Sequence, residues 1–287
     1  MRPTAFCGGY PGPQAGIASR TRNREDGVPP CCRKTHEDMS EREDLVLAYR
    51  ILAAHGVVDA YGHVSLRTAK DPKRYLLARA MAPELVTNDD IVEFDLDSAP
   101  IKDPGVALYL ERYIHGEIFK SRPDINAVVH NHSPSVIPFG VTTVPLRPLF
   151  NTGAFIGEGV PTFEIRDFQD SGDLIIKTPH LGRSLATTLG AKPAALMRGH
   201  GAVVVGESLM LAVVRSVYLE LSAKLQMQAM LIAGPGGHIV YLDDREVAAT
   251  SGRQVSAGTW KRTWDLWCIK ARAQIEMEEK AKRRRKK

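Results

Sequence analysis

The sequence of 287 residues lacks an apolar run long enough to span a membrane. A spanning helix needs about 20 consecutive apolar residues, whereas the best runs here, 202–205 and 209–214, are short and interrupted by Gly206 and charged side chains. Cysteine is also scarce and shows no paired spacing, its four positions being Cys7, Cys31, Cys32 and Cys268. These absences argue against a transmembrane protein and a disulfide scaffold, and they predict a soluble cytoplasmic protein with no membrane partner.

Positive charge is sparse in the body of the chain, although the whole sequence carries a net charge of +5. Seven of the last eight residues, 280–287, are Lys or Arg, so the remainder is slightly acidic. We interpret this basic tail as a solvated end; a nuclear-import-like address and an electrostatic tether to polyanions are the alternatives. Because the body has no net positive charge, we assign no nucleic-acid partner.

Composition divides the chain into four segments. Residues 1–39 are rich in Gly, Pro, Arg and Ser, and they are predicted to be a disordered N-terminal extension. Their arginines weakly resemble a mitochondrial presequence, but the prolines would break its helix. Met39 opens the more protein-like part, so a start site placed too far upstream is an alternative. Residues 40–250 are predicted to form one domain, 251–279 a Trp-rich packing segment, and 280–287 the basic tail.

Apolar periodicity predicts alternating helices and strands within the domain. Residues at helical spacing predict helices over 40–56, 107–120 and 209–231. Short apolar runs predict buried strands, among them 127–130 and 174–176. No internal repeat is visible. This pattern is typical of a single domain of the α/β or α+β class.

Three of the nine histidines form a pattern that a purely structural role explains poorly. His130 and His132 are two residues apart at the end of an apolar strand, so both rings are expected on the same side. His200 lies between two glycines after another apolar strand, where a sharp turn is expected. Two imidazoles on one strand face make half of a metal site. Three histidine ligands leave at least one position open, as in catalytic sites.

A carboxylate suited to proton transfer is present elsewhere in the sequence. Glu111 and His115 are four residues apart on a predicted helix and therefore share a helix face. Either residue could move a proton if it came within hydrogen-bond reach of a reacting atom. An ordinary surface pair of Glu and His is the alternative.

Four motifs carry a family resemblance. In chain order they are Gly62-His63-Val64-Ser65, Glu111-Arg112-Tyr113-Ile114-His115, the run from Arg122 to His132, and Gly199-His200-Gly201. In their order and spacing, they resemble the class II aldolase/adducin family over about residues 42–245.

This resemblance implies a three-layer α/β/α fold around a mostly antiparallel central sheet, and commonly a homotetramer with its sites at subunit interfaces. It also implies that His130, His132 and His200 bind a divalent metal, usually Zn²⁺, with Mn²⁺ and Fe²⁺ as alternatives. Glu111 would be the acid/base residue of a metal-dependent carbon–carbon lyase.

Two departures from the aldolase pattern concern the substrate. Aldolases of the family hold a phosphate with an Asn in a Gly-Asn-x-Ser motif and with a Ser-Ser pair just before the Glu. This chain has His63 in the first place and Tyr109-Leu110 in the second. Without those amide and hydroxyl donors a phosphate would be poorly held, so a sugar phosphate is disfavoured.

Variant motifs around 79–85 and 138–148 resemble a decarboxylase branch of the same family. Its members act in aromatic-acid catabolism on substrates such as hydroxy-carboxymuconic semialdehyde or dihydroxyphthalate. His63, Ser65 and Arg79 are our candidates for binding a second carboxylate of such a substrate, because a guanidinium matches a carboxylate bidentately.

We therefore expect the chain to decarboxylate a small carboxylated molecule through a metal-stabilised enolate. The alternatives are aldolase or epimerase chemistry on a hydroxy-carbonyl substrate, an iron-dependent oxygenase, and a non-enzymatic adducin-like binding module. The basic tail mildly favours the last of these, whereas the retained histidines and Glu111 argue against it.

Overall fold

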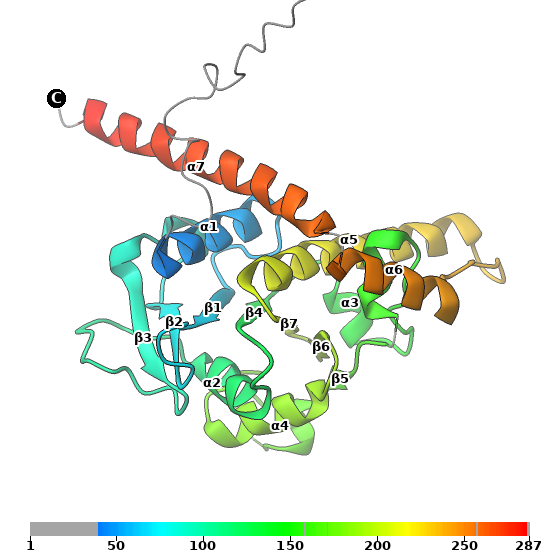
Figure 1. Cartoon of the computed structure of the whole chain (residues 1–287). Helices are drawn as coiled ribbons and strands as arrows, with labels where there is room; N and C mark the ends of the chain where they lie inside the picture. Colours follow the sequence, from blue (N-terminus) through cyan, green and yellow to red (C-terminus); the bar gives the residue numbers. More distant parts are fainter. Residues whose placement is uncertain (1–39, 158, 171, 257, 286–287) are drawn as a thin grey trace, which may run out of the picture.

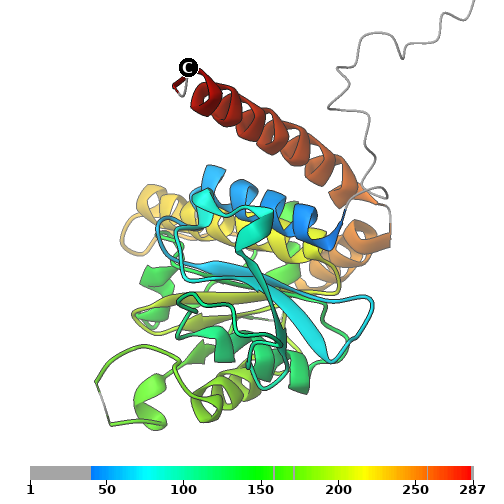
Figure 2. The same cartoon turned by 90° about the vertical axis from the view of Figure 1, so that its left-hand side faces the viewer.

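A seven-stranded sheet forms the middle layer of the computed structural model, and helices cover both of its faces (Figure 1, Figure 2). The structure describes residues 40–157, 159–170, 172–256 and 258–285. The extension predicted at 1–39, with three of the four cysteines, lies outside the described residues. Within those ranges, none of the helices combines the length and the apolar character needed to cross a membrane.

Helices and strands alternate through most of the chain. The helices are α1 (Glu41–Ala54), α2 (Arg112–Ser121), α3 (Ile137–Gly140), α4 (Pro179–Leu189), α5 (Leu209–Ala233), α6 (Asp244–Ser256) and α7 (Thr259–Arg285). The strands are β1 (His63–Arg67), β2 (Arg74–Ala78), β3 (Ile91–Asp95), β4 (Ala127–Asn131), β5 (Thr162–Phe163), β6 (Ala194–Met197) and β7 (Gly201–Gly206).

The strands are ordered β3-β2-β1-β4-β7-β6-β5 across the sheet. Neighbouring strands are antiparallel except β5 and β6, which are parallel. This arrangement confirms the expected three-layer fold around a mostly antiparallel sheet. In the middle of the sheet, His130 of β4 lies opposite His63 of β1 on one side and Val203 of β7 on the other.

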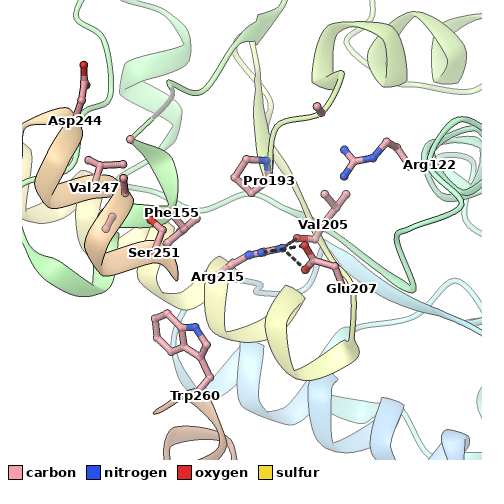
Figure 3. A pocket seen from close by; sticks show the side chains of 14 residues that line it. Arg122, Phe155, Pro193, Val205, Glu207, Arg215, Asp244, Val247, Ser251 and Trp260 are labelled. Atoms are coloured by element: carbon pink, nitrogen blue, oxygen red, sulfur yellow. Dashed lines mark hydrogen bonds and ion pairs between the residues drawn. The ribbon is translucent and has the colours of Figure 1, made fainter. Parts of the chain in front are cut away.

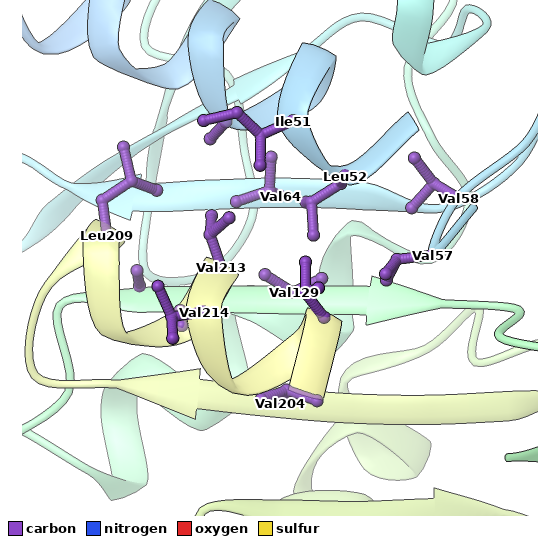
Figure 4. Close-up of a cluster of buried hydrophobic side chains, with 14 of the residues drawn as sticks. Ile51, Leu52, Val57, Val58, Val64, Val129, Val204, Leu209, Val213 and Val214 are labelled. Carbon is purple, nitrogen blue, oxygen red and sulfur yellow. The ribbon is translucent and has the colours of Figure 1, made fainter. Parts of the chain in front are cut away.

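Helices α1 and α5 cover one face of the sheet and bury its apolar side chains. Val64, Val129 and Val204, from β1, β4 and β7, belong to this core (Figure 4). They are joined there by Leu52 of α1 and Val213 of α5. All five side chains are almost fully buried, and burial of this kind is the main favourable term in folding.

Helices α2 and α4 cover the opposite face. Val128 and Val203 project to this side and pack in a second core with Ile118 of α2 and Leu185 of α4. Because side chains alternate along a strand, every second residue of β4 belongs to this face. The ring of His130 therefore lies on the α2 side of the sheet.

Two predicted elements differ from those observed. The helix expected over 107–120 begins only at Arg112, because Glu111 ends a non-helical segment in which the Tyr109 hydroxyl donates to the carbonyl of Met81. Residues 174–176 were predicted to be a strand, and they form no regular structure. The helices expected over 40–56 and 209–231 are confirmed as α1 and α5.

The three tryptophans of the C-terminal segment are packing residues. Helix α7 lies across α1 and α5 (Figure 1, Figure 2), and Trp260, Trp264 and Trp267 are buried in that interface. The ring of Trp267 lies 4.4 Å from that of His55, and the ring of Trp260 lies 5.3 Å from that of Tyr218. The segment therefore adds a further helix outside the α1 and α5 layer.

Candidate metal centre

Three histidines meet at one end of the central strands. β4 carries His130 as its penultimate residue, and His132 follows directly after the strand. His200 occupies the tight turn between β6 and β7, where its backbone N–H donates to the carbonyl of Met197. Because β4 and β7 are antiparallel, the end of one lies beside the start of the other. The topology thus brings together residues that are far apart in sequence.

Glycines on both sides of His200 allow this approach. Gly199 has φ +64°, a conformation that side chains with a Cβ rarely adopt. A Cβ at position 201 would overlap the carbonyl oxygen of Asn131, so only glycine lets β7 start this close to the end of β4. The Gly-His-Gly motif is therefore explained by the geometry that presents the His200 ring.

The three imidazoles and Glu111 form a compact donor cluster. One ligand atom from each of His130, His132, His200 and Glu111 lies within 4.8 Å of the others. The Nε2 atoms of His132 and His200 are 3.0 Å apart, and Oε2 of Glu111 lies 3.4 Å from Nε2 of His130 and 3.6 Å from Nε2 of His200. A tetrahedral ion with bonds of about 2.0 Å separates its ligand atoms by roughly 3.3 Å. The observed spacings fit a divalent metal.

Backbone carbonyls determine which ring nitrogens are available to a metal. Nδ1 of His200 donates to the carbonyl of Leu174 at 2.8 Å, and Nδ1 of His130 donates to that of Ala202 at 3.2 Å. A neutral imidazole with its proton on Nδ1 offers a lone pair at Nε2, the usual arrangement for metal ligands. Within the part of the chain that the structure describes, Nε2 of His130 is buried without a hydrogen-bond partner, and Oε2 of Glu111 lies 3.4 Å away. The cluster therefore has unprotonated donors for a cation.

Glu111 is held as a carboxylate in this cluster. It is the residue before the first turn of α2, and its Oε1 accepts a hydrogen bond from the backbone N–H of Ile176 at 3.1 Å. Burial raises the pKa of the carboxyl, but the interactions with His130 and His200 outweigh burial and lower the pKa to about 2. Burial lowers the pKa of His132 to about 4, with smaller contributions from the neighbouring imidazoles. The site therefore combines a carboxylate with a cluster of imidazoles, of which His132 has a pKa well below its ordinary value.

A second histidine pair lies behind the cluster. Nδ1 of His63 lies 2.6 Å from Nε2 of His115, and Nδ1 of His115 lies 2.6 Å from Oγ of Ser65. The side chain of His115 is 0% exposed, and burial lowers its pKa to about 3. The His63 ring lies 5.0 Å from that of His130. Among His63, Ser65 and His115, His63 is the residue whose ring lies next to the donor cluster.

Arg79 has a partner that sequence reasoning did not anticipate. Its Nε lies 2.7 Å from Oδ1 of Asp90, and its side chain is 37% exposed. Asp90 also accepts from the hydroxyl and the backbone N–H of Thr87. Arg79 thus pairs with a carboxylate of the chain itself, at the point where β2 ends and β3 begins.

Two aromatic residues beside the cluster were not predicted as site residues. Tyr61 is 67% exposed, and its ring stacks on that of His132 with centroids 6.0 Å apart. The ring of Tyr109 lies 4.5 Å from that of His63. Both positions adjoin motifs that were recognised, since Tyr61 directly precedes Gly62. That adjacency is the signal that could have identified them.

A cavity lies at the opposite ends of the same strands (Figure 3). It has a volume of about 570 Å³ and is lined in part by Arg122, Arg215 and Trp260. Arg215 pairs with Glu207 at 2.8 Å, and Arg122 pairs with Asp124 at 2.7 Å. Carboxylates of the chain therefore pair with both guanidinium groups in this cavity. It differs from the donor cluster, which brings several imidazoles and a carboxylate together.

Similarity to known proteins agrees with the fold and the cluster. The family profile described as the Class II Aldolase and Adducin N-terminal domain matches residues 43–227. The decarboxylase tropJ of Talaromyces stipitatus is 34% identical over 237 residues, which span 76% of this chain and 88% of tropJ. The 3,4-dihydroxyphthalate decarboxylase of Arthrobacter keyseri is 30% identical over 224 residues, which span 72% of this chain and 84% of that enzyme.

A solved structure shows the same fold. The aldolase II superfamily protein of Pseudomonas syringae superposes with a TM-score of 0.68 at 23% identity, covering 84% of this chain and 96% of that one. The residues matched by the family profile include all four members of the Glu/His cluster. The chain belongs to the class II aldolase and adducin family, and within it resembles decarboxylases.

Proposed function

We propose that this protein is a divalent-metal-dependent decarboxylase of carboxylated dihydroxyaromatic acids, such as a dihydroxyphthalate, or of carboxylated hydroxymuconic semialdehydes. Both curated relatives described above are decarboxylases, and one is named for 3,4-dihydroxyphthalate. The cluster supports this chemistry, because its three imidazoles suit a divalent metal with an open position and its carboxylate lies beside them.

The contact between His63 and Tyr109 is the main observation that favours a planar conjugated acid over a sugar phosphate as the substrate. The family's aldolases place an amide and a hydroxyl at these positions to hold a phosphate, whereas this chain packs an imidazole against a phenol ring at 4.5 Å. The Tyr109 hydroxyl is used by the carbonyl of Met81. The exposed ring of Tyr61 adds a flat surface beside His132. A planar conjugated acid suits these surroundings better than a sugar phosphate does.

The proposed metal ligands are the Nε2 atoms of His130, His132 and His200. When bound, a divalent cation would supply a Lewis acid that stabilises the negative charge of the enolate left by departing CO₂. Decarboxylation breaks the bond between the reacting carbon and its carboxylate and leaves the electron pair on that carbon. The carbon must then gain one proton.

Glu111 is the residue proposed to move that proton. Its low pKa keeps it ionised, so it can accept a proton from a substrate hydroxyl and return it to carbon after CO₂ departs. Solvent then restores the hydroxyl proton. The hydrogen bond from Ile176 fixes one carboxylate oxygen and leaves Oε2 facing the imidazoles.

A comparison of substrates tests this proposal. Purified protein would be incubated in D₂O with 3,4-dihydroxyphthalate, a carboxylated hydroxymuconic semialdehyde and L-fuculose 1-phosphate, and CO₂ and organic products would be measured. We expect CO₂ release from at least one of the first two, with one deuterium on the carbon that lost it, and no cleavage of the sugar phosphate. Aldehyde formation without CO₂ would instead favour the aldolase alternative.

A further inference from the structure

Ser65, His115 and His63 form a linear series of hydrogen bonds, and the His63 ring at its end lies 5.0 Å from that of His130 in the donor cluster. Ser65 and His63 project from β1 on the same side of the sheet, and His115 comes from α2 to lie between them. Both hydrogen bonds measure 2.6 Å. The side chains of Ser65 and His115 are 0% exposed and that of His63 is 3% exposed, so water does not compete within the chain.

The hydroxyl of Ser65 determines which atoms donate and which accept in this series of hydrogen bonds. Within the described part of the protein, its one hydrogen-bond partner is Nδ1 of His115. If the hydroxyl accepted from His115, its own proton would be buried without an acceptor, which is costly. We therefore assign Ser65 as the donor, which leaves Nδ1 of His115 unprotonated and its proton on Nε2.

The same assignment fixes the donor and acceptor of the second hydrogen bond, between His115 and His63. Nε2–H of His115 donates to Nδ1 of His63, so the neutral His63 ring carries its proton on Nε2. The two nitrogens of an imidazole point in widely different directions, so Nε2 points away from His115. Among the described residues, Nε2 of His63 has no hydrogen-bond partner. It is left to donate to a ligand bound beside His130.

We propose that Ser65 and His115 are positioning residues that fix His63 in the tautomer protonated on Nε2, so that His63 donates a hydrogen bond to a substrate oxygen. In the proposed reaction, on which this part of the inference rests, that oxygen belongs to the second carboxylate of the substrate. His115 then contacts neither the substrate nor the metal. Its role differs from the proton transfer expected from the sequence, and Ser65 acts through His115 instead of contacting the substrate.

The tautomer of His63 can be measured without any enzymatic assay. Full-length, zinc-loaded protein would be labelled with ¹⁵N-histidine, and the protonated ring nitrogen would be read from two-bond ¹H–¹⁵N correlations. The His63 signals are assigned by their loss in His63→Asn. We expect one tautomer, protonated on Nε2, in the wild-type protein and a mixture of tautomers in Ser65→Ala. A wild-type His63 protonated on Nδ1 would overturn the proposal, whether or not Ser65→Ala folds.

Tyr75→Phe is the matched control. Tyr75 stacks on His115 with ring centroids 6.3 Å apart, and its hydroxyl donates to Ser98 at 2.9 Å, outside the hydrogen-bond chain. This variant removes a buried hydroxyl beside the same ring, so it should leave the His63 tautomer unchanged. An equal change in Tyr75→Phe and Ser65→Ala would mean that the effect is general loosening, and it would contradict the proposal.

Kinetics on the decarboxylation substrate separate positioning from mere structural support. Binding of a carboxylate that does not react contributes to KM, so Ser65→Ala and His115→Ala should raise KM about tenfold with kcat nearly unchanged. His115→Gln should restore KM, because its amide N–H can donate to His63 while its carbonyl accepts from Ser65. Failure of glutamine to rescue would contradict the positioning role. If no substrate is decarboxylated, the tautomer measurement still decides the proposal while the proposed function fails separately.

Discussion

Replacing His132 with alanine is expected to remove the bound metal and to lower kcat/KM for decarboxylation at least about a thousandfold. His132 provides one of three imidazoles in the cluster, and its Nε2 lies 3.0 Å from that of His200. With two imidazoles left, a divalent ion loses a strong ligand and the enolate loses its electrostatic stabilisation. Elemental analysis of the purified variant and release of CO₂ from the preferred substrate measure the two effects.

The matched control for this variant is His180→Ala. His180 lies in the first turn of α4 with an exposed side chain, and its nearest ring neighbour is Phe168 at 6.4 Å. It should keep both metal and turnover. A His132→Ala protein with full activity would show that the cluster is not the catalytic centre.

Replacing Glu111 with glutamine is expected to lower kcat by about a hundredfold to ten-thousandfold while the metal stays bound. Glutamine keeps the shape of the side chain, and its carbonyl oxygen can still accept from the backbone N–H of Ile176. It cannot take up and return a proton. Steady-state rates together with the metal content of the same preparation would show whether chemistry and metal binding separate.

Glu117→Gln is the control for loss of a buried carboxylate on the same helix. Glu117 is on α2, is buried, and pairs with Lys120 at 2.8 Å, away from the donor cluster. Its activity should stay close to that of the wild type. If Glu111→Gln retained wild-type kcat, the proton-transfer role would be wrong, and if it lost its metal, Glu111 would be a ligand instead.

Local sequence patterns were sufficient to predict the strand that leads to the site and a long helix that packs on the sheet. The apolar residues of β4 predicted a buried strand that leads to His130, and the structure confirms it as Ala127–Asn131. The helical spacing of the last long apolar segment predicted α5. The mostly antiparallel sheet was implied only by the family resemblance, and the strand order was not predicted, because strand pairing joins residues whose separation leaves no local pattern.

Residues around 174–176 illustrate why other features could not be predicted. Their apolar character is typical of a strand, but their backbone groups bond to site residues instead of to a neighbouring strand. The carbonyl of Leu174 accepts from His200, and the N–H of Ile176 donates to Glu111. Sequence periodicity contains no information on such tertiary hydrogen bonds.

The partners of Arg79 and His115 were hidden for the same reason. The sequence presents each as a polar residue within a motif, and only the three-dimensional arrangement pairs Arg79 with Asp90 and buries His115 beside His63. A polar residue near a motif therefore does not by itself identify a substrate contact. The burial and existing partners of each side chain are needed before a role is assigned.

The central claim is that His130, His132 and His200 bind a metal on which decarboxylation depends, with Glu111 beside it as the proton-transfer residue. The most direct measurement is elemental analysis of the purified protein and of a chelator-treated sample, with CO₂ release assayed on both. We predict about one divalent ion per chain, loss of CO₂ release after stripping, and recovery when the ion is restored. Undiminished CO₂ release from metal-free protein would contradict the claim.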